Sequence, residues 1–252
     1  MIKIKKEFND LKVRFFGILI VIFILFFLLA PLQRFTISFL EGYSSSPQIE
    51  KFLPSNMLSK LKEWNFYINS QWYGKNYGQI IPIISIIMAF PLFAREFENN
   101  TIAFLLVRKN RREVFFSKFT AGFVALSIVL LTAGFLPLIY SFLLSKDYNY
   151  AIGMKFAFQS YFSGLFWYGV GVLFSLMFND QVRPLLAGFG TIAITTVAGI
   201  LRPLKFMNTY NYALGVKIFE TGNIDISYTI GVIIITILII IISHNIFLRK
   251  EV

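Results

Sequence analysis

The sequence lacks cysteine altogether and contains one histidine and 13 acidic residues in a chain of 252. Without cysteine there are no disulfides, no thiolate metal sites and no cysteine nucleophiles. The single histidine, His244, lies near the end of an apolar run, where an interfacial side chain is the simplest expectation. Membrane-embedded proteases need paired acids, or histidines beside a nucleophile, and the sequence places neither within its apolar runs.

Hydrophobic residues make up 56% of the chain, including 30 Phe, and a membrane span needs about 20 such residues in a row. We predict an all-α membrane protein, a single transmembrane domain over 1–252 with six transmembrane helices. The six runs are 15–32, 77–93, 119–144, 156–178, 185–201 and 228–247. None contains Asp, Glu, Lys or Arg, the groups that bind the driving ion in ion-coupled carriers. Any energy for transport is therefore expected from outside the spans.

The basic residues predict the orientation. With a cytosolic amino terminus, 14 of the 24 Lys and Arg fall on inner segments of 50 residues in total, against 10 on outer segments of 81. Both termini are therefore predicted to be cytosolic. The net charge of +11 fits contact with anionic lipid headgroups, and no basic face on a soluble region suggests nucleic acid. Richness in Phe, Ile, Lys and Asn suggests an AT-rich genome such as that of a Gram-positive bacterium, so we expect the protein in a bacterial plasma membrane.

Three segments outside the runs have their own character. Residues 1–14 form an amphipathic pattern typical of an interfacial helix, with Phe8 and Leu11 on its apolar face. Residues 33–76 are expected to form a large extracellular loop. Six aromatic residues between 64 and 77, at the end of this loop and the start of the second span, are expected at the membrane surface. Contact with a partner or substrate is the alternative role for them. Residues 202–227 are too charged to cross but apolar enough to lie on or dip into the outer leaflet.

Inside the spans the polar content is limited to uncharged side chains. Ser160 and Gly164 form a small-xxx-small pair, and Thr191 and Thr195 lie one turn apart. Such faces serve intramolecular packing, or line a pathway or dimer contact, and both uses stay open. The three prolines within spans two and three, Pro82, Pro91 and Pro137, are expected to kink their helices.

The most informative segment is 94–118, AREFENNTIAFLLVRKNRREVFFSK, which lies on the predicted cytosolic side. Asn-Asn-Thr is a turn former, and Thr101 is a candidate N-cap for a helix from Ile102 to Lys109. Asn110 and Glu113 then have the spacing of a capping box before the next span. We predict helix, break, short helix, break and helix. An interfacial connector lying on lipid is the alternative.

This segment resembles the one between spans two and three of ABC type-2 permeases, the membrane subunits of bacterial ABC exporters. That family shows an acid pair, Gly-Thr, Leu-Leu and then basic residues before a Lys at the next span, here Lys118. Asn100 replaces the usual Gly, and Asn is the next most tolerant residue in a left-handed turn. The family's usual Pro after Leu-Leu is missing.

The resemblance implies that the short helix couples the chain to a separate ABC ATPase. Two copies of that ATPase would serve a pair of permease subunits, either a homodimer or a pair with a close paralogue. ATP and Mg would bind the partner, since this chain has no phosphate-binding loop. The chain itself would be a transporter subunit without enzymatic activity or cofactors. The residues implied in coupling are Glu96, Glu98, Thr101, Ile102, Leu105, Leu106, Arg108, Arg111 and Arg112, with the three apolar ones forming the docking face.

The resemblance also implies export of an amphipathic or hydrophobic cargo. A Phe-rich, uncharged pathway suits peptide toxins, of which phenol-soluble modulins are an example, and it suits drugs. It also suits antimicrobial peptides, whose export would give the cell immunity to them. Two other classes stay open. A scaffold or immunity protein without transport would leave a partner's ATP turnover insensitive to changes at Glu98 or Arg112. A carrier or channel would conduct without any ATPase.

Overall fold

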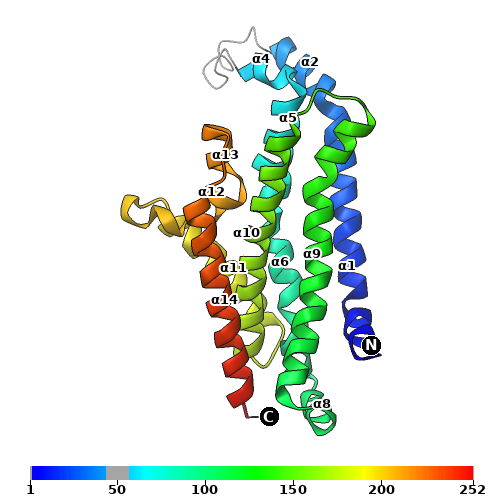
Figure 1. Cartoon of the computed structure of the whole chain (residues 1–252), viewed down its shortest axis with the longest axis vertical. Coiled ribbons are helices and arrows are strands. Elements are labelled where there is room, and N and C mark those ends of the chain that lie inside the picture. The colour runs from blue at the N-terminus through cyan, green and yellow to red at the C-terminus, as the bar shows by residue number, and fades with distance from the viewer. Residues whose placement is uncertain (1, 44–56, 252) are drawn as a thin grey trace.

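The computed structural model describes residues 2–43 and 57–251, and in these ranges all regular structure is helical. Long helices run side by side along one axis, with both termini and α8 at one end and α2 and α4 at the other (Figure 1). The elements are α1 (Ile2–Leu29), η1 (Ala30–Leu32), α2 (Gln33–Tyr43), α4 (Met57–Lys62), α5 (Trp64–Gln71), η2 (Trp72–Asn76), α6 (Tyr77–Ala89), α7 (Pro91–Glu98), α8 (Ile102–Arg108), α9 (Arg111–Leu143), α10 (Tyr150–Met177), α11 (Val182–Ala198), η3 (Arg202–Met207), α12 (Thr209–Ala213), α13 (Val216–Thr221) and α14 (Ile226–Arg249).

Five helical stretches in the described ranges are long and apolar enough to cross a bilayer. They correspond to five of the six predicted spans, although the second is much longer than expected and runs from Trp64 to Glu98. The other predicted span is α11, whose 17 residues leave it shorter than these five. The chain is therefore a multi-pass membrane protein, and α11 is the element on which a sixth crossing depends.

The amino-terminal amphipathic segment is not a separate element. Helix α1 runs without interruption from Ile2 into the first span. Glu7, Leu11 and Phe15 follow each other at intervals of four residues and are all buried. This part of α1 therefore packs on the protein, chiefly along α9, in addition to any contact that it makes with lipid.

The predicted outer loop is largely helical. Residues 33–43 form α2, and 57–76 form α4, α5 and the π-helical turn η2, which leads directly into α6; the remainder, 44–56, lies outside the described residues. The prediction of a surface belt is wrong for five of its six aromatic side chains, which are buried in the core: Trp64, Tyr67, Trp72, Tyr73 and Tyr77. Phe66 is half-buried.

Four of these five aromatic residues donate to backbone carbonyls of other helices, and Trp64 donates to Ser141 Oγ at 2.7 Å. Within α9, Pro137 has no N–H, so the carbonyl of Ala133 one turn earlier lacks its helical donor. The indole Nε1 of Trp72 donates to that carbonyl at 2.9 Å, and the hydroxyl of Tyr73 donates to the carbonyl of Gly134 next to it. Neighbouring helices therefore satisfy the backbone where proline interrupts it, as a span in lipid requires.

The second helical stretch is interrupted at Phe90, between α6 and α7, immediately before Pro91. The N–H groups of Phe93 and Ala94, in the first turn of α7, donate to Ser175 Oγ of α10 at 3.0 and 3.1 Å. First-turn N–H groups have no partner within their own helix. A side chain from α10 thus caps α7. At Pro82 and Pro137, by contrast, α6 and α9 continue as helices, so the predicted break occurs only before Pro91.

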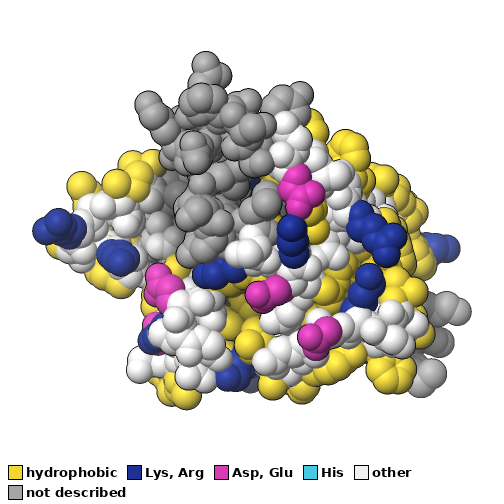
Figure 2. Space-filling model, turned by 90° about the horizontal axis from the view of Figure 1, so that it is seen from above, with side chains coloured by type: hydrophobic (Ala, Val, Ile, Leu, Met, Phe, Trp, Pro, Cys, Tyr) yellow, Lys and Arg dark blue, Asp and Glu magenta, His cyan; other side chains and the backbone are white. Residues whose placement is uncertain are grey.

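Residues 202–227 fold into η3, α12 and α13 before α14 begins. They lie toward the end of the molecule opposite α8 (Figure 1). Seen from above, this end carries charged side chains across its face and hydrophobic ones around much of its perimeter (Figure 2). That distribution suits a face in contact with water whose sides adjoin lipid.

Candidate functional site

The candidate site is the junction of α7, α8 and α9 at the end that carries both termini (Figure 1). Asn100 has φ of 53°, so the prediction of a left-handed turn at this position is confirmed. The N–H of Asn100 donates to the carbonyl of Phe97 at 3.1 Å, and that of Thr101 to the carbonyl of Glu96 at 2.9 Å. This pair of bonds is a Schellman motif, which ends α7 and reverses the chain into α8.

Thr101 occupies the N-cap position of α8, but its side chain accepts no hydrogen bond from that helix. The predicted cap is therefore wrong, because the Thr101 hydroxyl donates instead to the Glu96 carboxylate. The second predicted cap is confirmed, since Asn110 Oδ1 accepts the N–H of Glu113 at 2.8 Å. The expected alternation of helices and breaks between 94 and 118 is confirmed too, with α8 one residue shorter than predicted.

A buried ion cluster lies at the base of the junction. Lys118 Nζ of α9 is 2.8 Å from Glu7 Oε2 of α1 and 2.7 Å from Glu96 Oε1 of α7. The exposed fractions of the three side chains are 4%, 8% and 15%. One ammonium thus faces two carboxylates away from water, and the Thr101 hydroxyl provides the Glu96 carboxylate with a further donor. Because breaking such a pair leaves an uncompensated buried charge, the cluster holds α1, α7 and α9 together.

Sequence reasoning missed Glu7. It belongs to a lysine-rich stretch whose charges were assigned to the lipid surface. The available signal was its position four residues before Leu11 and eight before Phe15, which places it on the apolar face of the helix. An acid on the buried face of an amphipathic helix needs a cationic partner.

Two cations attach the carboxyl-terminal segment to the junction. Arg111 Nη1 donates to the carbonyls of Phe247 and Lys250 at 3.1 and 2.6 Å. Lys250 Nζ donates to the carbonyl of Leu176 at 2.7 Å and lies 3.9 Å from the ring centroid of Phe97. Burial lowers the pKa of Lys250 below its ordinary value. Both cations meet carbonyls at the ends of helices, which favour positive charge.

The other predicted coupling residues differ in their contacts and exposure. Glu98 accepts a hydrogen bond from Gln181 Nε2 in the turn before α11. Arg108 and Arg112 are exposed. The only histidine of the chain, His244, packs beside the rings of Phe115 and Phe116 at centroid distances of 5.0 and 5.3 Å.

The apolar side chains of α8 point in two directions. Ile102 is 2% exposed and belongs to the protein's own core, and Leu105 and Leu106 are half-buried against it. Phe104 and Val107, three residues apart, are 74% and 85% exposed. The predicted docking face is thus turned largely inward, and sequence reasoning missed the exposed pair. The sequence gives no signal that singles out this pair, because nearly every position of α8 is apolar.

The second predicted set lies elsewhere. Ser160 and Gly164 are buried in α10, where a β-carbon on Gly164 would come within 2.3 Å of Leu130 Cδ1 of α9. Gly164 therefore allows α9 to pack closely against α10. Thr191 and Thr195 are half-buried on α11 and donate to carbonyls of their own helix at 2.8 Å.

The described residues contain no group of three or more His, Asp or Glu placed to hold a metal ion. The polar groups of the junction bind one another and the ends of helices, across segments that are far apart in the sequence. Helix α8 is thus connected to α1 and α9 through the turn at Asn100 and the Lys118 cluster, and α9 is connected to α14 through Arg111.

Comparison with known proteins agrees with this geometry. The sequence profile of the ABC-2 family transporter proteins matches residues 1–217, which include the whole junction except the carboxyl-terminal segment attached by Arg111 and Lys250. No curated protein and no solved structure matches the chain. The match covers most of the chain, so the protein belongs to the ABC-2 family of transporter proteins as a membrane subunit.

Proposed function

We propose that the chain is the permease subunit of an ATP-driven exporter in a bacterial plasma membrane, with both termini and α8 in the cytosol. Two permease subunits, identical or close paralogues, would pair with two ATPase subunits that bind ATP and Mg. The cargo would be amphipathic or hydrophobic, such as a peptide toxin, an antimicrobial peptide or a drug. The observation that carries the proposal is the exposed apolar pair on α8, Phe104 and Val107, above a buried ion cluster.

The contacts of the junction support a route for force. A partner that seats Phe104 and Val107 in an apolar cleft, with Arg108 and Arg112 at its rim, would hold α8 firmly. Displacement of α8 would pass through the Schellman turn to Glu96 and through Lys118 to α1 and α9. Because packed helices are bistable rather than continuously deformable, a small shift at α8 would switch the spans between two arrangements.

The first experiment is affinity purification of the chain from its native membrane in mild detergent, followed by mass spectrometry. We expect a stoichiometric ATPase with a phosphate-binding loop. Phe104→Asp and Val107→Asp should abolish its recovery, because each places a charge in an apolar contact. Leu144→Asp is the matched control, since Leu144 is 51% exposed at the far end of α9.

The result also separates the alternatives. Recovery of the chain without an ATPase, with flux in liposomes that needs no ATP, would favour a carrier or channel. Recovery of an ATPase whose rate of ATP hydrolysis is unchanged by Glu98→Ala and Arg112→Ala would favour a scaffold or immunity protein. Equal recovery of the ATPase with Phe104→Asp and with Leu144→Asp would remove α8 from the contact.

A further inference from the structure

A loop between α11 and α12 projects sideways from the helical bundle (Figure 1). Its two ends are in contact, because a β-carbon on Gly199 would come within 2.9 Å of Asn208 Cα. Between these ends lies η3, which packs chiefly on α11 and has no buried residue, whereas α12 packs on α6 and α10. The loop is therefore a closed projection that the described part of the chain leaves largely uncovered.

The surface of this loop combines large apolar side chains with two cations. Ile200, Leu201 and Phe206 are 77%, 58% and 67% exposed, and Arg202 and Lys205 are exposed as well. Seen from above, basic and hydrophobic side chains lie side by side on the projection (Figure 2). The sequence of the loop contains no acidic residue. Such a composition suits a membrane surface, where apolar side chains enter the acyl region and cations stay among the phosphates.

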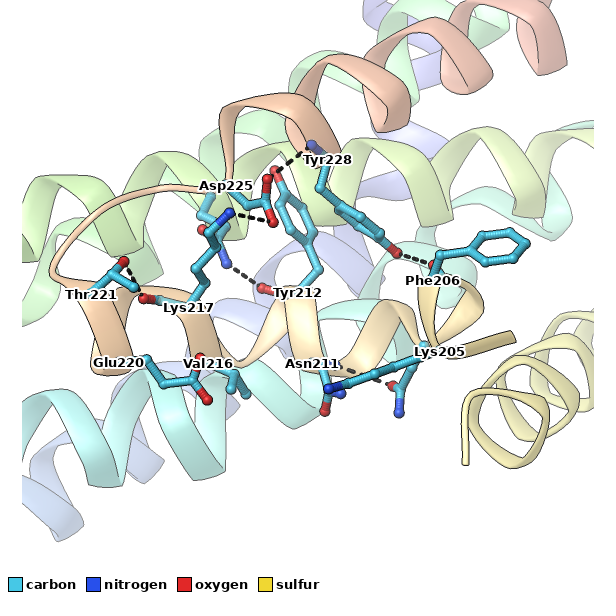
Figure 3. A pocket seen from close by; sticks show the side chains of 12 residues that line it. Lys205, Phe206, Asn211, Tyr212, Val216, Lys217, Glu220, Thr221, Asp225 and Tyr228 are labelled. Atoms are coloured by element: carbon cyan, nitrogen blue, oxygen red, sulfur yellow. Dashed lines mark hydrogen bonds and ion pairs between the residues drawn. The ribbon is translucent and has the colours of Figure 1, made fainter. Parts of the chain in front are cut away.

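The start of α14 marks the level of that surface. Immediately before this helix, Lys217 pairs with Asp225 at 2.8 Å, and the hydrogen bond from Lys217 lowers the pKa of Asp225, so the carboxylate is ionised (Figure 3). The apolar side of α14 begins at the next residue, since Ile226 and Ile230 are 70% and 52% exposed. With 24 residues, α14 is about 36 Å long, slightly more than the roughly 30 Å of the hydrocarbon core. The boundary between headgroups and acyl chains therefore lies near its first turn.

A hydrogen bond holds the loop at this level. The hydroxyl of Tyr228, in the first turn of α14, donates to the carbonyl of Phe206 at 2.9 Å, and the Phe206 ring extends away from Tyr228 (Figure 3). On the other side of the loop, α11 has 17 residues and is only about 25 Å long. Ile200 and Leu201 follow directly after its end and add to its apolar length. Both sides of the loop thus lie where headgroups meet acyl chains.

We propose that this loop anchors the chain at the membrane surface by binding anionic phospholipids of the phosphatidylglycerol type. Ile200, Leu201 and Phe206 enter the upper acyl region, and Arg202 and Lys205 contact the phosphates. A second copy of the chain is a poorer occupant, because a protein contact would take both cations out of water and the loop supplies no carboxylate to balance them. Anionic headgroups provide the opposite charge at the same depth. This proposal is independent of the ATPase partner.

The depth of the loop is tested first. The chain has no cysteine, so a single one carries an NBD fluorophore without background. In nanodiscs whose lipids bear a nitroxide quencher on the acyl chain, Leu201→Cys and Phe206→Cys should be quenched about as strongly as Ile234→Cys, a 52% exposed position within α14. Glu220→Cys, exposed on α13, should be quenched little.

Two results would overturn the proposal, and iodide in the aqueous phase distinguishes them. Weak quenching by the lipid together with strong quenching by iodide would place the loop in water. Protection of both Leu201→Cys and Phe206→Cys from both quenchers would mean that protein covers the loop, such as a second copy of the chain.

The lipid preference is tested in the same nanodiscs, with the quencher carried by phosphatidylglycerol or by phosphatidylcholine at equal mole fraction. Phosphatidylglycerol should quench the fluorophore of Phe206→Cys at the lower mole fraction. Added to this variant, Arg202→Gln and Lys205→Gln should each reduce the local enrichment of phosphatidylglycerol about fivefold. Lys75→Gln, which removes an exposed cation of η2 outside the loop, should leave it unchanged. Equal quenching by the two lipids with both cations present, or an unchanged preference without them, overturns the proposal. The comparison of lipids needs no charge variant, so it stays decisive if such a variant fails to fold.

Discussion

The pairing of Trp72 with Pro137 gives the sharpest quantitative prediction. Pro137 leaves the Ala133 carbonyl without its helical donor, and Trp72 Nε1 supplies one from 2.9 Å away in a fully buried position. Trp72→Phe should therefore strand a buried carbonyl, at a cost of about 1–3 kcal/mol in the free energy of unfolding. Loss of the larger ring beside Phe26, whose centroid lies 4.9 Å away, adds a packing cost.

The second half of the prediction separates these two costs. Pro137→Ala restores an N–H to α9, which can donate to the same carbonyl. In that background Trp72→Phe should cost about 1–3 kcal/mol less, because only the packing loss remains. Unfolding of the purified protein in mixed micelles of mild detergent and dodecyl sulfate, for the two single variants and the double variant, measures this coupling.

Tyr77→Phe is the control. The Tyr77 hydroxyl donates to the carbonyl of Leu130 at 2.9 Å, but this carbonyl lies within α9 where a helical donor is present. Its removal should cost about 0.5–1.5 kcal/mol with or without Pro137→Ala. A coupling between Trp72→Phe and Pro137→Ala below about 0.5 kcal/mol would refute the account, since independent sites add within that margin.

Three further predictions concern other parts of the chain. Lys118→Met should destabilise the protein by about 3–5 kcal/mol, because two buried carboxylates lose their cation. Lys62→Met removes the cation of an exposed pair and should cost at most about 1 kcal/mol. The same micelle titration compares the two variants, and equal costs would contradict a buried cluster. Asn100→Val should cost about 1–3 kcal/mol at φ of 53° while Asn100→Gly stays near neutral, and melting temperatures in detergent will show whether the two variants differ. The pKa of Asp225 is lower in the folded state, so its ionised carboxylate stabilises the fold above the unfolded pKa, and this stabilisation is lost below about pH 4. The difference in melting temperature between the wild type and Asp225→Asn should accordingly become smaller from pH 6 to pH 3. A constant difference would argue against the ion pair.

Local signals in the sequence predicted local structure well. The turn at Asn100 and the cap at Asn110 were predictable because each depends on one side chain and the backbone within three residues of it. Runs of apolar residues likewise predicted the long helices. These features need no knowledge of what lies across the fold.

Features that depend on distant partners were not predictable in the same way. Aromatic side chains before span two fit a membrane surface or a core equally well, and only their acceptors on α9, more than 50 residues away, decide between the two. The apolar residues of α8 occupy six of its seven positions, so no periodicity reveals which side faces inward. Glu7 required the position of Lys118, which is 111 residues away.

The cap that Ser175 provides for α7 connects two elements at the end of the molecule that carries both termini (Figure 1). Neighbours in sequence, α6 and α7, are separated at Phe90, whereas α7 and α10 share two hydrogen bonds across about 80 residues. A displacement of α7 would therefore act on α10 directly, through these two bonds. Together with the ion cluster at Lys118, the Ser175 cap ties the short helix α7 to three long helices, α1, α9 and α10.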